Sequence, residues 1–141
     1  MSKQFAAQRQ IRASSDAVWA FLTDAKALVA ADTGITRIEG EIAPGGSFKL
    51  WSEATGDRAF KITVAEFEKP RRMVWTSGMP LGLFRGTRTF AVSETESGCT
   101  FDMDEVFTGL FSGPITKSMP DLTPFFERFV ESAKQAAEAD A

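Results

Sequence analysis

The sequence predicts an α+β fold, in which a curved antiparallel sheet of about seven strands wraps around a long C-terminal helix. Two short helices are expected after the first strand. Three patterns predict this arrangement. The last segment carries a broad apolar stripe at helical spacing, formed by Leu122, Phe125, Phe126, Phe129, Val130, Ala133, Ala136 and Ala137. Short apolar runs with strand-like alternation fill residues 35–107, and only residues 14–34 interrupt the strands with helical spacing. An antiparallel sheet with one apolar face needs a cover, and the last helix is the only long amphipathic one.

The first third of the chain contains one strand and two helices. "KQFAAQRQIR" (3–12) is the first predicted strand. Ser14 or Ser15 can cap a helix over "SSDAVWAFLTD", whose apolar residues follow helical spacing. Asp24 offers a second cap, so "AKALVAADTG" (25–34) is expected to form another short helix that ends at Gly34.

The middle of the chain contains six further predicted strands, separated by turns rich in glycine and proline. They are "ITRIEGEI" (35–42), "SFKLW" (47–51), "DRAFKITVAEFE" (57–68), "MVWTS" (73–77), "LFRGTRTFAVSE" (83–94) and "CTFDMDEVF" (99–107). The last two form a hairpin around "TESG". A turn centred on Glu96 and Ser97 pairs Phe90 with Met103 and Arg88 with Glu105.

Length and charge limit the classes of protein that the chain can belong to. Its 141 residues, 43% of them hydrophobic, predict a single domain over 1–141. A net charge of −3 and a pI of about 5.0 argue against binding to nucleic acid. No apolar run reaches the length of about 18 residues that a membrane span needs. The first ten residues lack the apolar core of a secretory signal, and the single Cys99 cannot form an internal disulfide, so a cytoplasmic location is predicted.

The residue types that are missing restrict the chemistry. There is no histidine, which removes Ser-His and Cys-His catalysis and histidine-based metal sites, and we predict no metal and no cofactor. Tyrosine is also absent, while there are 13 phenylalanines and 3 tryptophans. Aromatic surface with almost no hydroxyl groups favours holding an apolar molecule over polarising a substrate.

Glu105 breaks the pattern of its strand. Phe101 and Met103 share its parity and are expected to face the core, whereas Asp102 and Asp104 alternate with them toward water. A buried carboxylate needs a partner, and the predicted hairpin places Arg88 directly opposite. Three roles are open for this pair: a structural ion pair, a pair that orients the polar end of a ligand, or a catalytic pair. No catalytic residue is assigned.

A set of inward-facing aromatic and apolar residues forms the predicted lining of a ligand cavity between the sheet and the last helix. Most inward residues are expected to be plain core. Trp75, Phe84, Phe90 and Met103 are the preferred lining residues, because they should lie midway along the sheet, across from the helix. The complete predicted ligand-binding set is Trp75, Phe84, Arg88, Phe90, Met103, Glu105, Phe107, Phe125, Phe126 and Phe129.

Two loops contain more large apolar residues than loops usually do. "TSGMPLGLFRG" and "TGLFSGPITKSMP" contain Met79, Leu81, Leu83, Leu110, Phe111, Ile115 and Met119. Such loops can form lids over a cavity or a homodimer contact, and both interpretations stay open. Trp51 is expected to point outward or lie at an edge, where it can mark an interface.

The order of these elements resembles the START-like, or helix-grip, superfamily (SRPBCC), which includes polyketide cyclase/dehydrase-like proteins, and in particular its uncharacterised bacterial members. The segments that carry the resemblance are "ASSDAVWAFLTD", "IEGEIAPGGSFKL", "VAEFEKPRRMVWTS", "FDMDEVFTG" and "PDLTPFFERFVESAKQAAE". The resemblance implies a cavity that binds a small, mostly apolar partner of lipid, polyketide or aromatic type. It also leaves two alternatives: a polyketide cyclase-type enzyme that uses Arg88 and Glu105, or an interaction module resembling the chaperone-ATPase activators.

Overall fold

One seven-stranded antiparallel sheet and four helices make up the part of the chain that the structure describes. The structure is a computed structural model, and it describes residues 3–54, 56–79 and 81–139. The elements in chain order are β1 (Lys3–Ile11), α1 (Ser15–Leu22), α2 (Ala25–Ala30), β2 (Ile35–Glu39), β3 (Ser47–Ser52), β4 (Phe60–Glu68), β5 (Arg72–Met79), β6 (Phe84–Thr95), β7 (Gly98–Thr108), α3 (Ser112–Ser118) and α4 (Thr123–Ala139).

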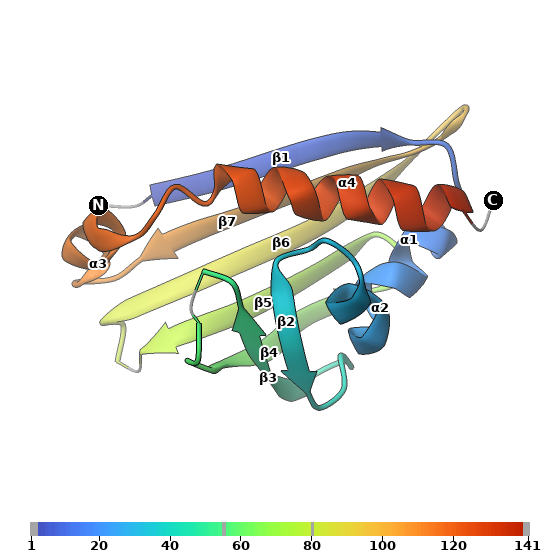
Figure 1. Cartoon of the computed structure of the whole chain (residues 1–141). Helices are drawn as coiled ribbons and strands as arrows, with labels where there is room; N and C mark the ends of the chain where they lie inside the picture. Colours follow the sequence, from blue (N-terminus) through green and yellow to red (C-terminus); the bar gives the residue numbers. More distant parts are fainter. Residues whose placement is uncertain (1–2, 55, 80, 140–141) are drawn as a thin grey trace.

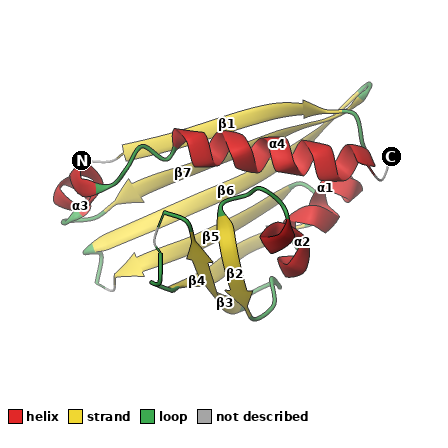
Figure 2. Cartoon of the chain, in the orientation of Figure 1, coloured by secondary structure: helices red, strands yellow, loops and turns green. Residues whose placement is uncertain are grey.

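The sheet follows the predicted α+β plan. Its strand order is β1-β7-β6-β5-β4-β3-β2, so β1 lies at one edge beside β7, and β2 lies at the other. The sheet curls into a half-barrel and α4 runs along its inner face (Figure 1). Figure 2 shows α3 at one end of the molecule and α1 and α2 toward the other. This confirms the predicted fold class, including the two short helices after the first strand.

Side-chain caps start the two short helices where the sequence predicts them. The Ser14 hydroxyl accepts a hydrogen bond from the Ala17 N–H (3.1 Å), and the Asp24 carboxylate accepts one from the Ala27 N–H (3.2 Å). However, α2 ends at Ala30, before the predicted end at Gly34. The Thr33 hydroxyl closes a turn there, because it donates to the Leu28 carbonyl (2.6 Å) and accepts from the Ile35 N–H.

Two further details differ from the sequence-based expectation. Residues 112–118, which were expected to be part of a loop, form the helix α3. Phe60 shares the parity of Ile62 and Val64, which predicts a buried ring, but Phe60 is exposed. Phe60 is the first residue of β4 and lies at the strand end, so its ring has less of the sheet around it.

The inner face of α4 forms the centre of the core. Its buried residues include Phe126, Phe129, Val130 and Ala133. The Phe129 ring lies 5.8 Å from the Phe90 ring of β6 and 6.4 Å from the ring of Phe21 in α1. Full burial of one such apolar side chain contributes roughly 1.5–3 kcal/mol to the free energy of unfolding. Among the described residues, no helix is both long enough and apolar enough to cross a membrane.

Ion pairs hold α4 on both of its flanks. On one side Arg9 of β1 contacts Glu127 (2.8 Å) and Glu131 (3.0 Å) of the helix. On the other side Arg128 of the helix binds Asp32 and Glu53, which lie in the loops after α2 and β3. Hydrogen bonds from Arg128 lower the pKa of both carboxyls below their ordinary values. We call Arg128, Asp32 and Glu53 the Arg128 clasp.

The pKa shifts in the Arg128 clasp predict how stability changes with pH. Because the folded-state pKa values of Asp32 and Glu53 are lowered, the stabilisation is present above the ordinary carboxyl pKa of about 4. It is lost as the pH falls through the lowered values. Arg128→Met is therefore expected to lower the midpoint of thermal unfolding at pH 7. The difference from the parent protein should disappear in acid.

The control for this prediction is Arg71→Met. Arg71 forms an exposed ion pair with Glu68, three positions away in the same turn (2.6 Å). An exposed pair of this kind contributes little to stability, so the control should unfold close to the parent at both pH values. An Arg128→Met effect that persisted in acid would assign the stabilisation to the packing of Arg128 on the Phe125 ring instead.

Candidate functional site

Arg88 and Glu105 form an ion pair on the inner face of the sheet. They are directly opposite each other in the β6–β7 register, which confirms the predicted pairing. The Arg88 Nε and Nη2 atoms each lie 2.8 Å from Oε1 of Glu105. The Arg88 side chain is 22% exposed and the Glu105 side chain 10% exposed. The Glu105 side chain is therefore buried, whereas the Arg88 side chain is partly exposed.

Aromatic rings surround this pair. The Arg88 guanidinium lies over the ring of Phe126 in α4, with Cζ 4.9 Å from the ring centroid. Phe5 is opposite Glu105 in the neighbouring strand, and its ring lies 6.1 Å from that of Phe126. On the other side Trp75 of β5 is opposite Arg88. Two opposite charges thus lie among apolar rings, where electrostatic attraction is stronger than in water.

Gly86 provides the space for the Glu105 carboxylate. A Cβ atom at position 86 would lie 2.7 Å from Oε2 of Glu105 and 3.1 Å from a ring carbon of Phe107. Any other residue would push against the carboxylate. Both contacts of Arg88 use Oε1, so Oε2 lies outside the ion pair and beside Gly86.

Trp75 contributes a second polar group. Its side chain is buried, and its Nε1 is the one buried side-chain polar atom of the described chain that has no hydrogen-bond partner. The indole packs edge-on against Phe48 (5.1 Å) and Phe90 (4.6 Å). A buried donor without an acceptor costs roughly 1–3 kcal/mol. The sequence indicated that Trp75 faces inward, but not that its N–H lacks a partner, because ring orientation depends on packing.

The structure buries most of the predicted ligand-binding set. Buried residues of the set are Trp75, Phe90, Met103, Glu105, Phe107, Phe126 and Phe129, while Phe84, Arg88 and Phe125 are partly exposed. Phe84 and Phe107 stack beside the ion pair at 5.7 Å. Phe90 and Phe129 lie deeper, in contact with Phe101. Phe125 packs partly buried against the core and contacts Arg128 and Gly34.

Two surface hollows lie elsewhere. One of about 860 Å³ lies between α1, the start of α2 and the segments near Gly40 and Phe67, and one of about 340 Å³ lies between α2 and β2. Neither is lined by a residue of the predicted ligand-binding set. The assignment of that set to a ligand cavity stays a prediction. Within the described residues, no cluster of three or more carboxylate or thiol side chains could hold a metal ion.

Comparison with known proteins shows the family of the chain. A family model described as "Polyketide cyclase / dehydrase and lipid transport" matches residues 2–138, so the chain belongs to this family. This agrees with the superfamily resemblance found in the sequence. A comparison with curated proteins found no match.

Solved structures with low sequence identity share the fold. Protein MLL2253 from Mesorhizobium loti is 17% identical, with a TM-score of 0.76 and 99% of each chain covered. Hypothetical protein jhp0584 from Helicobacter pylori is 13% identical, with a TM-score of 0.78, 96% of this chain and 88% of that chain covered. The di-domain ARO/CYC StfQ from the steffimycin biosynthetic pathway is 14% identical with a TM-score of 0.76; the match covers 99% of this chain and 52% of that one.

The different exposure of the two charges predicts unequal effects of removing them. Arg88→Met leaves the Glu105 carboxylate buried without its partner, which should cost about 3–5 kcal/mol of unfolding free energy. Glu105→Leu leaves a guanidinium that can reach water, so the loss should be smaller. The double variant should recover part of the loss, with a coupling energy of at least about 1 kcal/mol. Denaturant unfolding of all four proteins measures this; additive effects would contradict the pairing.

Gly86→Ala tests whether the carboxylate needs the space beside Gly86. The added methyl group meets Oε2 of Glu105, and overpacking of this kind costs typically about 1–3 kcal/mol. The matched control is Gly113→Ala, because a Cβ at Gly113 meets nothing within 4 Å. The control should unfold no earlier than the parent in denaturant, because alanine is favoured over glycine in the helix α3. Equal destabilisation of both variants would show that the contact with Glu105 is not the cause.

Proposed function

We propose that the protein binds a small, mostly apolar molecule with one polar end, between the sheet and α4. The observation that carries this proposal is the Arg88–Glu105 ion pair, which lies within an otherwise aromatic inner surface. Arg88 can donate to a carboxylate, carbonyl or hydroxyl oxygen, and Glu105 can accept from a hydroxyl group. The aromatic rings around the pair would hold the apolar part of the molecule.

Three observations support a ligand-orienting role over a purely structural one. The Arg88 side chain is partly exposed, so a ligand can approach it from the surface. The nearby Trp75 has a buried N–H without an acceptor, and a ligand oxygen could provide one. The family description includes lipid transport, and lipids combine apolar chains with a polar end. We also propose a cytoplasmic location, where the buried thiol of Cys99 would stay reduced.

A cyclase-type reaction is a second candidate. It is favoured by the family description, which names polyketide cyclases and dehydrases, and by the presence of a carboxylate beside the aromatic rings. In such a reaction Glu105 would accept a proton from the substrate and Arg88 would stabilise an oxygen that becomes negative. An interaction role for Trp51 has less support, because the Trp51 ring is partly buried and covered by the Arg37 guanidinium at 4.9 Å.

A matched pair of fluorescent probes tests the proposed ligand class. Anilinonaphthalene sulfonate and N-phenylnaphthylamine share the same ring system, and only the first carries an anionic group. Both probes should bind the parent protein. In the double variant Arg88→Met with Glu105→Leu, the sulfonate probe should lose about tenfold or more in affinity, because a hydrogen bond to a charged group contributes about 1.5–3 kcal/mol. The uncharged probe should bind within about twofold of the parent.

The possible outcomes separate the roles of the site. Equal binding of both probes to the parent and the double variant would make the ion pair structural. Absence of binding of either probe to the parent would contradict the cavity. Phe90→Trp enlarges a buried ring that packs against Phe129, so it should weaken the binding of both probes to the same extent if they bind between sheet and helix.

A further inference from the structure

The end of the molecule that carries α3 exposes several large apolar side chains. Leu81 is 93% exposed and Leu110 80% exposed, and Met79 and Phe111 are about half exposed. Leu81 lies in the turn between β5 and β6, and Leu110 lies between β7 and α3. We call these four residues the apolar tip. Met79 is the last residue of β5, and the other three residues lie in the two connections that follow β5 and β7, so the tip is a compact feature.

The backbone holds the two loops of the apolar tip together. The Leu110 N–H donates to the Gly82 carbonyl (3.3 Å), and the Phe111 N–H donates to the Leu83 carbonyl (2.7 Å). Gly109 permits this approach, because a Cβ there would lie 2.7 Å from the Leu83 carbonyl oxygen. The apolar tip is therefore built into the fold by loop-to-loop hydrogen bonds.

The backbone conformation of Leu81 and the exposure of its side chain are both energetically unfavourable for the isolated protein. Its φ of 62° makes it the one residue other than glycine with positive φ in the described chain. A leucine rarely adopts this conformation, and here its side chain also points into water. Strained residues of this kind concentrate at functional sites. The position would suit glycine or asparagine if only the turn were needed.

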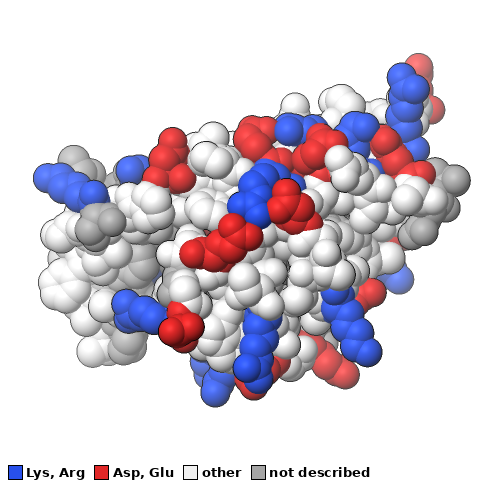
Figure 3. Space-filling view, in the orientation of Figure 1, with Lys and Arg blue, Asp and Glu red and all other residues white. Residues whose placement is uncertain are grey.

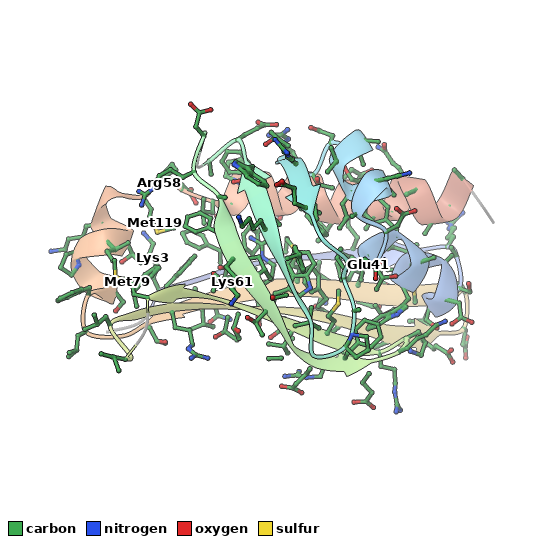
Figure 4. All side chains as sticks on the ribbon, turned by 90° about the horizontal axis from the view of Figure 1, so that it is seen from below. Lys3, Glu41, Arg58, Lys61, Met79 and Met119 are labelled. Atoms are coloured by element: carbon green, nitrogen blue, oxygen red, sulfur yellow. The ribbon has the colours of Figure 1, made fainter. Side chains whose placement is uncertain are left out.

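Basic residues predominate around the apolar tip. The described segments at this end (Lys3, 56–61, Met79, 81–86 and 107–121) contain five basic residues, Lys3, Arg58, Lys61, Arg85 and Lys117, against the two acidic residues Asp57 and Asp121. The chain as a whole carries −3. Figure 4 shows Lys3, Arg58, Lys61 and Met79 in the same half of the molecule, with Glu41 in the other half. Figure 3 shows acidic and basic side chains interspersed along α4, whereas the end with α3 is mostly uncharged.

We infer that the apolar tip docks on the surface of an anionic lipid bilayer. Apolar side chains that project from loops can enter the boundary of headgroups and acyl chains, while lysine and arginine around them attract anionic headgroups. A second copy of the chain fits this end less well. A two-fold contact would bring the same basic residues face to face, and a stable interface buries about 800 Å² per partner, far more than four loop side chains provide.

This inference adds a partner to the proposed function, but its test needs no ligand. The protein is mixed with vesicles of phosphatidylcholine containing a quarter phosphatidylserine, and the bound fraction is measured by flotation. The parent should float with these vesicles, and added salt should weaken the binding. Vesicles of phosphatidylcholine alone should bind it at least about tenfold more weakly.

Variants of exposed residues separate docking from folding. Leu81→Asp with Leu110→Asp should lower vesicle binding at least about tenfold. This variant should unfold no earlier than the parent, because both side chains are exposed and aspartate tolerates positive φ better than leucine. The control is Val29→Asp, a partly exposed apolar residue of α2 that is not part of the tip, and it should bind as the parent does.

Charge variants test the basic residues separately. Arg85→Gln with Lys117→Gln should weaken binding to anionic vesicles and reduce its dependence on salt. Three results would overturn the inference: the parent does not float with anionic vesicles, the Leu81→Asp with Leu110→Asp variant floats as well as the parent, or sedimentation shows a parent dimer that this variant dissociates. Probe binding by the parent without vesicle binding would leave the proposed function intact and reject docking alone.

Discussion

Burial of one face of α4 against the inner face of a single sheet is the interaction on which the other features depend. Phe126 and Phe129 occupy this face, and the strands curve around them. The ion pairs of Arg9 and of the Arg128 clasp then fix the helix on its two flanks. Because these contacts hold the helix in place, the Phe126 ring lies over the Arg88 guanidinium, so the core itself fixes the surroundings of the ion pair.

Much of this fold can be predicted from the sequence, because its apolar residues recur at the regular spacings of helices and strands. The stripe of α4, the alternation of the strands and the parity of Glu105 all follow from side-chain direction, which depends on position along the chain. The turn at Glu96 and Ser97 then determines the pairing of Arg88 with Glu105. Features that depend on contacts between distant segments were less visible. Gly113 and Pro114 favour a loop at the position where the helix α3 forms.

The chemistry of the site was partly predictable for the same reason. A charged residue on an apolar parity indicates a buried pair, and the structure places that pair among rings. Two features needed three-dimensional packing to appear: the Trp75 N–H without an acceptor and the contact between the Gly86 position and Oε2 of Glu105. Both depend on how side chains turn relative to neighbouring strands, which spacing along the chain does not specify. The Trp75 N–H adds a hydrogen-bond donor beside the predicted pair, and the Gly86 position limits the size of the residue that can lie next to the Glu105 carboxylate.

The position of β1 has a consequence for how the protein folds during synthesis. β1 pairs with β7, and Gln8 and Asp102, which are bonded across these strands, are 94 positions apart. The ribosome therefore releases β1 long before its partner strand exists. Until β7 and α4 emerge, Phe5 and Ile11 have no native surface to cover them, and late closure of distant contacts is slow. The nascent chain is thus expected to depend on chaperones more than a helical protein of the same length would.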